Sequence, residues 1–233
     1  MKGKREKTAL AVRRGDSMTY SRLHRLLAGL VLRLFRIRVH YAEREPREGC
    51  YLLCCNHISA VDPVILAAAL RNRQPHFMAK KELFGIPLLG TLLRAINAFP
   101  VDRSGGDVAA IKATVALIEN GDCVGVFPQG TRCPGRAPDA ANDAVKSGVG
   151  LLCERTKVRV LPVCLKVKHD RLRLFGRGDL IIGESVSYEQ LTGKDDEAFQ
   201  SLRRQERYDL LARRIFGRIC ALYEEGVPHE TCE

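Results

Sequence analysis

Short apolar runs alternate with segments of helical periodicity along most of the chain. The apolar runs predict strands at 36–41, 50–55, 76–79, 98–101, 123–127, 159–165 and 179–182. The segments between them predict helices at 63–71, 87–96, 108–120, 145–155 and 199–224. Such alternation is typical of a mostly parallel central sheet flanked by helices, so we expect an α/β fold. The stretch 133–143, rich in Pro, Gly, Asp and Ala, is expected to be irregular.

An amphipathic pattern precedes the first predicted strand. Apolar residues recur at offsets of three and four on one helical stripe, namely Leu23, Leu26, Leu27, Leu30, Val31 and Leu34. Arginines lie on the other side, at Arg22, Arg25, Arg33 and Arg36, and Leu32 is the one bulky apolar residue off the stripe. The apolar stretch is shorter than the ~20 residues that span a bilayer. A helix lying in the lipid headgroup layer fits this pattern, and so does a terminal helix packed on the protein's own core.

Positive charge is concentrated at the start of the chain. The net charge is +11, and residues 1–50 contain 13 Lys or Arg and 5 Asp or Glu, so they carry most of the excess. We therefore divide the chain into a basic N-terminal segment, 1–40, with the membrane-associating helix, and a single α/β domain, 41–233. A basic end indicates an anionic partner, which could be a membrane, a nucleic acid or an acidic protein.

Cysteine usage and the N-terminus indicate the kind of cellular compartment. The nine cysteines are odd in number and no pair is spaced Cys-x-x-Cys, so we expect reduced, mostly buried thiols and no metal site. The first residues contain no apolar core long enough for a signal peptide. These features indicate a reducing compartment.

The first candidate for chemistry follows the strand at 50–55. Asp62 and Pro63 form a helix start, with Asp62 as the expected N-cap, so His57 lies in a loop between strand and helix. Across a loop, the two side chains can face each other. A carboxylate that holds one imidazole nitrogen leaves the other free to accept a proton, which makes His57 a candidate general base. A capping Asp beside an unrelated loop His remains the alternative.

Two later strand ends offer groups that suit a phosphate. Gly130, Thr131 and Arg132 follow the strand at 123–127, and they combine main-chain amides, a hydroxyl and a guanidinium. Arg103 follows the strand at 98–101 and could supply a second guanidinium. Each feature alone is weak, because an Arg at a strand end is usually solvated.

In this order, the motifs resemble those of the lysophosphatidic acid acyltransferases, the 1-acylglycerol-3-phosphate O-acyltransferases. The family's Asn-His-x4-Asp block corresponds to Asn56–Asp62, and its block ending in Arg after a Phe-containing strand corresponds to Asn97–Arg103. The block that is usually Phe-Pro-Glu-Gly-Thr-Arg corresponds to Phe127–Arg132, and the apolar strand with Leu-Pro-Val corresponds to Val160–Val163. The basic N-terminus and the helix after Phe199 lie outside the resemblance.

The resemblance implies an enzyme of phospholipid synthesis. It would transfer a fatty acyl group from a thioester to the free hydroxyl of 1-acylglycerol-3-phosphate and so form phosphatidic acid. His57 would be the general base, oriented by Asp62, and the acceptor's phosphate would be held by Arg103, Gly130, Thr131 and Arg132. Lys80 or Lys81 could add positive charge. No cofactor or metal is implied, and the donor substrate would be acyl-coenzyme A or acyl-carrier protein.

The implied partners are a lysophospholipid and an anionic membrane surface, and nucleic acid is not among them. The expected location is the cytoplasmic face of the membrane, with peripheral or monotopic attachment. Gln129 stands where the family usually has Glu, which keeps the size and loses the charge. Because His57 and Asp62 are present, we expect an active enzyme in which Gln129 contacts the acceptor and alters its choice.

Three other functions fit parts of the sequence. The first is an acyltransferase that uses another lysolipid acceptor. The second is a nucleic-acid-binding protein, but 6 Tyr, 8 Phe and no Trp give few aromatic residues for stacking on bases. The third is an inactive membrane-binding scaffold, which the presence of all the candidate catalytic residues disfavours.

Overall fold

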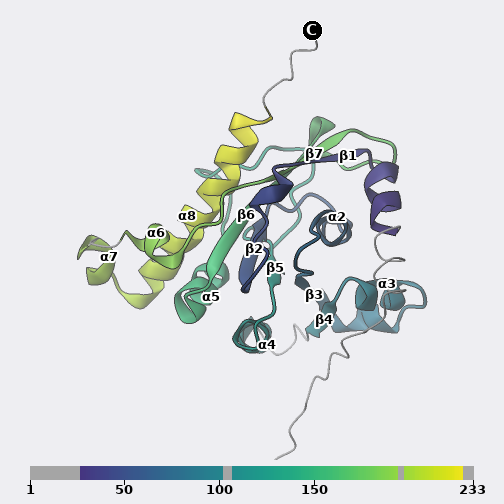
Figure 1. Cartoon of the computed structure of the whole chain (residues 1–233). Coiled ribbons are helices and arrows are strands. Elements are labelled where there is room, and N and C mark those ends of the chain that lie inside the picture. Colours follow the sequence, from purple (N-terminus) through teal and green to yellow (C-terminus); the bar gives the residue numbers. More distant parts are fainter. Residues whose placement is uncertain (1–26, 102–106, 194–196, 228–233) are drawn as a thin grey trace, which may run out of the picture.

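A seven-stranded sheet forms the centre of the protein (Figure 1), in a computed structural model that describes residues 27–101, 107–193 and 197–227. The strand order is β1-β7-β6-β2-β5-β3-β4. Neighbouring strands are parallel except β6 and β7, which pair antiparallel. The strands are β1 (Ile37–His40), β2 (Tyr51–Cys55), β3 (His76–Lys80), β4 (Ala98–Val101), β5 (Val124–Val126), β6 (Arg159–Val167) and β7 (Gly178–Ile182).

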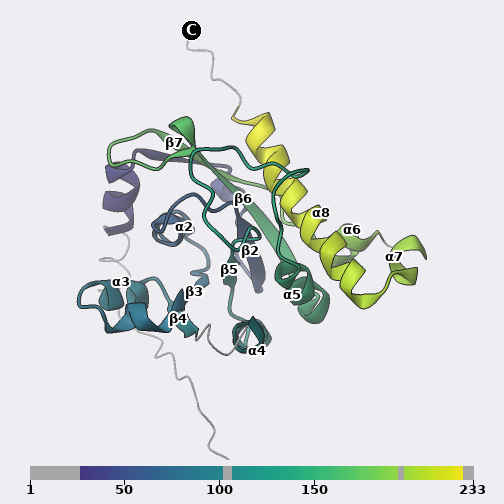
Figure 2. The same cartoon turned by 180° about the vertical axis from the view of Figure 1, so that it is seen from behind.

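Helices cover both faces of the sheet (Figures 1 and 2). The α-helices are α2 (Asp62–Ala69), α3 (Leu89–Ala95), α4 (Asp107–Glu119), α5 (Gly148–Thr156), α6 (Tyr188–Thr192), α7 (Glu197–Ser201) and α8 (Arg204–Glu225). Short 3-10 helices are η1 (Ala42–Arg44), η2 (Lys81–Gly85) and η4 (Lys168–Asp170). Successive side chains of β2 alternate between the two faces, as they do in any strand. Leu52 and Cys54 join the core under α4, α5 and α8, while Leu53 and Cys55 join the core under α2.

The expected α/β fold with a mostly parallel sheet is confirmed, and the strand positions agree within two residues. The single helix expected at 199–224 is wrong, because α7 and α8 are separate. Arg203 is extended between them, and its main-chain N–H donates to Glu206 Oε2 at 2.8 Å, which starts a new helix. Helix α6 was not expected. It begins at a capping box formed by Ser187 and Gln190.

The end of the N-terminal amphipathic segment is described. Residues 27–34 are helical, and Val31, Leu32 and Phe35 pack against the core. Leu27 and Leu30 remain 52% and 59% exposed. The off-stripe Leu32 therefore belongs to the core-facing side, and part of the expected stripe faces outward. Leu23, Leu26, Arg22 and Arg25 lie outside the described residues.

The pairing of β1 concerns the expected division at residue 40. Strand β1 lies before that boundary, yet it pairs in register with β7, with Ile37 opposite Gly178. The sheet therefore begins inside the segment expected to be separate, while the division into two units stays a prediction. Over the ranges that the structure describes, no helix has both the length and the apolar character needed to cross a membrane.

Candidate active site

His57 and Asp62 face each other at the carboxyl end of β2. His57 Nδ1 lies 2.7 Å from Asp62 Oδ2, and the Asp62 side chain is completely buried. Helix α2 starts at Asp62 itself, with Val61 before it, so the expected N-cap role is wrong by one residue. The carboxylate instead points back into the loop that carries His57.

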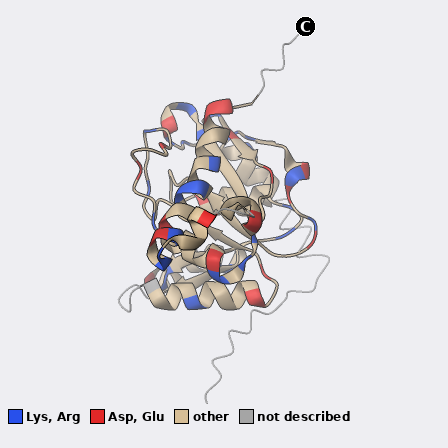
Figure 3. Cartoon of the chain, turned by 90° about the vertical axis from the view of Figure 1, so that its left-hand side faces the viewer, with Lys and Arg blue, Asp and Glu red and all other residues tan. Residues whose placement is uncertain are grey.

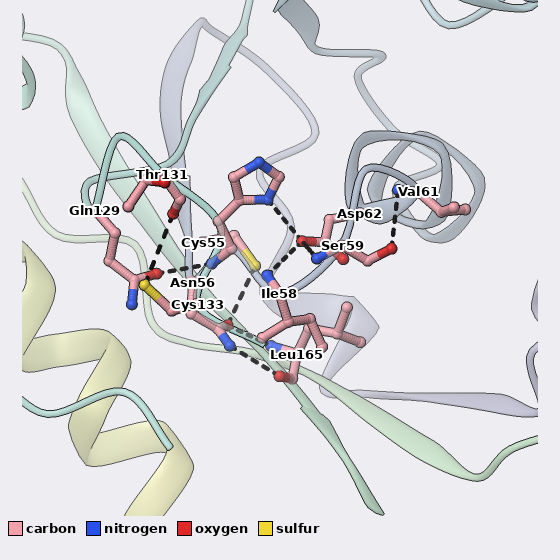
Figure 4. Close-up of polar contacts among 11 residues, drawn as sticks. Cys55, Asn56, Ile58, Ser59, Val61, Asp62, Gln129, Thr131, Cys133 and Leu165 are labelled. Atoms are coloured by element: carbon pink, nitrogen blue, oxygen red, sulfur yellow. Dashed lines mark hydrogen bonds and ion pairs between the residues drawn. The ribbon is translucent and has the colours of Figure 1, made fainter. Parts of the chain in front are cut away.

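One oxygen of Asp62 organises that loop. Besides the His57 ring, Asp62 Oδ2 accepts hydrogen bonds from the main-chain N–H groups of Ile58 at 2.7 Å and Ser59 at 2.8 Å (Figure 4). Two N–H donors identify this oxygen as an acceptor, so the ring nitrogen facing it must carry a proton. This tautomer leaves the lone pair of the imidazole on Nε2, the atom that a general base uses.

The main chain of His57 is held on both sides by the loop after β5. Its N–H donates to Gln129 Oε1 at 2.8 Å, and its carbonyl accepts from the N–H of Cys133 at 2.7 Å. The preceding residue, Asn56, is buried and bonds Leu165 of β6 with both ends of its amide, at 2.8 and 3.0 Å (Figure 4). Three neighbouring strands therefore fix the position of His57.

The ring of His57 stacks on Phe127, with centroids 4.0 Å apart and planes inclined by 18°. Its side chain is 17% exposed, and among the described residues none bonds Nε2. Packing on one face and the carboxylate at Nδ1 fix the ring, while its far edge remains accessible. That arrangement suits proton transfer to a substrate.

Gln129 is buried and uses its amide within the protein. Its Oε1 accepts from His57 N–H, and its Nε2 donates to Asp143 Oδ2 at 2.7 Å. Asp143 is also buried and forms an ion pair with Arg136. A carboxylate therefore lies one hydrogen bond beyond the place where the acyltransferase motif usually has one. The amide of Gln129 therefore holds the His57 loop from inside the protein.

The candidate phosphate ligands lie next to this loop. Gly130, Thr131 and Arg132 are exposed, and no described residue forms an ion pair with Arg132. Gly130 has a φ of +66°, and a Cβ there would lie 2.7 Å from Lys146 Cγ, so glycine is needed on both grounds. Arg103 lies outside the described residues. Lys80 and Lys81 are exposed at the end of β3 and the start of η2.

A cavity of about 400 Å³ opens beside Phe127 and Pro128. It lies between β3, β5 and the helices α4, α5 and α8, and Met78, Thr114 and Tyr208 are among its lining residues. Most of the lining is apolar, so the space next to the His57 stacking partner suits a hydrocarbon chain.

Three residues of this site have positions or contacts that the sequence does not predict. Asn56 was part of a motif but had no role, Asp143 lay in a stretch expected to be irregular, and Lys146 was not considered. No periodicity marks Asp143 or Lys146, because their positions depend on how the loop at 128–146 folds back. Lys146 N–H donates to Pro128 O at 2.8 Å, which brings the two ends of that loop together.

Four buried cysteines near the site are unsuited to nucleophilic chemistry. Burial raises the pKa of the Cys54 and Cys55 thiols, and it raises the pKa of Cys153 and Cys164 to about 12. Thiols in such surroundings are poor nucleophiles. Within the described ranges, no group of three or more His, Cys, Asp or Glu side chains could hold a metal ion.

This fold and this His–Asp site define a class of protein. The sequence profile of the Acyltransferase family matches residues 36–166, more than half of the chain. The chain belongs to the acyltransferase family and is an acyltransferase by that membership.

Two bacterial relatives are named after a more specific reaction. The 1-acyl-sn-glycerol-3-phosphate acyltransferase of Bacillus subtilis is 33% identical over 152 residues, which cover 64% of this chain and 73% of that protein. The Streptococcus pneumoniae protein of the same name is 30% identical over 194 residues, covering 81% of this chain and 70% of that one. The expected resemblance to the lysophosphatidic acid acyltransferases is confirmed.

A solved structure supports the fold. The crystal structure of PlsC, the 1-acyl-sn-glycerophosphate (LPA) acyltransferase of Thermotoga maritima, matches with a TM-score of 0.60. The match covers 88% of this chain and 78% of that chain at 22% identity. At this identity the likeness concerns the arrangement of helices and strands.

Proposed function

We propose that the protein transfers a fatty acyl group from an acyl thioester to the free hydroxyl of 1-acylglycerol-3-phosphate, giving phosphatidic acid. The observation that carries the proposal is the contact of 2.7 Å between His57 Nδ1 and Asp62 Oδ2, which lies in the part of the chain that matches the family. The names of the bacterial relatives supply the choice of acceptor.

In the proposed reaction, the acceptor hydroxyl gives its proton to His57 Nε2 while its oxygen attacks the thioester carbonyl carbon. The tetrahedral intermediate then collapses, the carbon–sulfur bond breaks, and the imidazolium returns the proton to the leaving thiolate. Asp62 stabilises the imidazolium through its buried carboxylate. Because a thioester is already activated, one base and good positioning suffice.

The acceptor's phosphate is proposed to bind at Gly130, Thr131 and Arg132, with Arg103 as a further ligand. Main-chain amides, a hydroxyl and guanidinium groups are suitable donors to phosphate oxygens. Lys146 belongs beside them, because its side chain lies against Gly130. The apolar cavity next to Phe127 is proposed to hold an acyl chain while the ester forms.

Because the substrates are lipids, the site must meet a membrane. We propose peripheral or monotopic attachment at the cytoplasmic face, through the helix that includes residues 27–34. The exposed Leu27 and Leu30 support this attachment. Gln129 favours one alternative, an acyltransferase for another lysolipid acceptor.

A single assay tests the proposal. Purified protein is incubated with oleoyl-coenzyme A or oleoyl-acyl-carrier protein and with lysophosphatidic acid, lysophosphatidylcholine or lysophosphatidylglycerol, and ester formation is measured. We expect turnover on lysophosphatidic acid and a fall of ~10²–10⁴-fold in His57→Ala. Turnover confined to another lysolipid would establish the alternative, and a fully active His57→Ala enzyme would rule out the mechanism.

A further inference from the structure

The loop between β6 and β7 contains two adjacent, exposed apolar side chains. We call residues 168–177 the β6–β7 tip. Within it, Leu174 is 60% exposed and Phe175 is 68% exposed, while Leu172 packs against the core. A single exposed apolar residue is ordinary, but two adjacent large ones at the end of a loop form a small apolar patch that water solvates poorly.

The main chain holds Phe175 in this outward position. Its φ is +59°, a left-handed conformation that is unfavourable for a bulky aromatic residue. Its N–H donates to Leu34 O at 2.8 Å, and Gly176 N–H donates to Arg173 O at 3.0 Å. The first bond fastens the tip to the end of the helix at 27–34, and Figures 1 and 2 show the loop before β7 beside that helix.

The charge of the tip fits an anionic partner. Four of its five charged residues are basic, namely Lys168, Arg171, Arg173 and Arg177, and all four are exposed. None of them forms an ion pair with another described residue. The acidic one, Asp170, accepts a hydrogen bond from the Tyr223 hydroxyl at 2.8 Å. The side of α7 and α8 differs from the tip, because basic and acidic residues are interspersed there (Figure 3).

The tip also lies at the edge of the sheet that carries His57. It continues directly from β6, where Leu165 exchanges hydrogen bonds with Asn56. Farther along, Gly135 N–H donates to Asp170 O at 2.7 Å, and Gly135 lies in the loop that holds the His57 main chain. A surface that receives Leu174 and Phe175 therefore meets the protein on the side of its candidate active site.

We propose that the β6–β7 tip is a second membrane contact. Leu174 and Phe175 enter the acyl boundary of a bilayer that contains anionic phospholipids, and the arginines beside them meet the lipid phosphates. Together with Leu27 and Leu30 on the neighbouring helix, the tip fixes the orientation of the protein as well as its attachment, because two contacts prevent rotation about one. The inference rests on the proposed function for its choice of a lipid partner.

Tryptophan fluorescence tests the proposal directly, because the chain contains no Trp. Phe175→Trp introduces a single reporter at the tip, Leu174→Trp is a second one, and Gln200→Trp on α7 is the matched control at the opposite end (Figure 1). The probe is a vesicle of phosphatidylcholine and phosphatidylglycerol. We expect a blue shift and quenching by brominated acyl chains at both tip positions and neither effect at position 200.

Binding variants supply the second measurement. Leu174→Ser combined with Phe175→Asn, which suits a left-handed backbone, should lower the partition onto these vesicles by ~10-fold or more. Replacing Arg171, Arg173 and Arg177 by Gln should weaken binding only on anionic vesicles at low salt. A charge control is Arg155→Gln with Arg159→Gln, two exposed arginines near the start of β6. It removes two positive charges away from the tip and should bind like the parent.

The outcomes that would contradict the proposed membrane contact can be told apart. Emission that is already blue-shifted without vesicles would mean that residues 1–26 cover the tip, and a shift that depends on protein concentration would mean that a second copy covers it. Either result, or unchanged vesicle binding in the Leu174 and Phe175 variant, overturns the proposal. None of these measurements requires acyl transfer. A protein that binds through its tip but does not acylate lysophosphatidic acid would therefore refute only the proposed function.

Discussion

Asp62 shows how much one carboxylate oxygen can organise. Oδ2 accepts from the His57 ring and from two main-chain N–H groups, while Oδ1 is buried and accepts no hydrogen bond among the described residues. The proposed catalytic role of the side chain depends on its charge, and its structural role depends on its position. Substitution with the isosteric amide separates the two roles.

Asp62→Asn should reduce turnover by ~10³–10⁴-fold, because the amide cannot stabilise the imidazolium and can favour the wrong tautomer. It should also lower the free energy of unfolding by ~1–3 kcal/mol, because one end of the amide is buried without a partner. Steady-state kinetics and chemical denaturation measure the two effects. A variant with near-parental turnover would show that the His57–Asp62 contact is not part of the chemistry.

Gln129 allows a test by a double-mutant cycle. Gln129→Glu places a second carboxylate against the carboxylate of Asp143. In the parent protein, a hydrogen bond of 2.7 Å joins the two side chains. We expect a loss of ~1–3 kcal/mol in unfolding free energy and lower activity, because His57 N–H bonds the same side chain. Asp143→Asn in the Gln129→Glu background should restore much of both, because an amide again faces a carboxylate.

Denaturation of the two single variants and the double variant gives the coupling energy, and acceptor profiles are measured on the same proteins. If Gln129→Glu is as stable as the parent and the cycle shows no coupling, the buried pair does not explain the tolerance of Gln at this position. An unchanged acceptor profile in both variants would show that position 129 does not influence acceptor choice.

At the scale of elements, α4 forms one wall of the apolar cavity. Ala110 lines that cavity, whereas the adjacent Ala109 is exposed on the same helix. Ala110→Phe should fill part of the space and shift preference toward shorter acyl chains, because the longer chains no longer fit. Ala109→Phe is the matched control and should keep the parental profile. Competition among thioesters of different chain length measures the shift, and identical profiles would place the acyl chain elsewhere.

Sequence periodicity predicts best the elements whose buried residues follow a regular pattern. All seven strands of the described sheet were predicted, because buried strands such as β2 and β6 are nearly continuous apolar runs. Asn56, Asp143 and Lys146 could not be placed, because their roles depend on contacts between segments far apart in the chain. The break between α7 and α8 was missed because residues 203–207, Arg-Arg-Gln-Glu-Arg, are good helix formers and contain no Gly or Pro that would mark a helix end.

The whole molecule must approach a bilayer, and its N-terminal helix is the first contact to test. Leu27→Asp with Leu30→Asp should release the protein from liposomes at low and high salt, because apolar burial does not depend on ionic strength. Arg33→Gln with Arg36→Gln should weaken binding mainly on anionic liposomes, by ~1 kcal/mol per residue. Co-sedimentation measures both. Full sedimentation of the folded double-Asp variant would assign attachment to another part of the chain.

The long-range hydrogen bonds that hold Asn56 and His57 have a consequence for the order of folding. The Asp62 contact is local and can form early, but Gln129 is 72 residues from His57 along the chain, and Leu165 is 109 residues from Asn56. Contacts of such long range form only after the intervening loops close. During refolding, regular secondary structure should therefore return before catalysis, and the appearance of activity marks the joining of β2, β5 and β6.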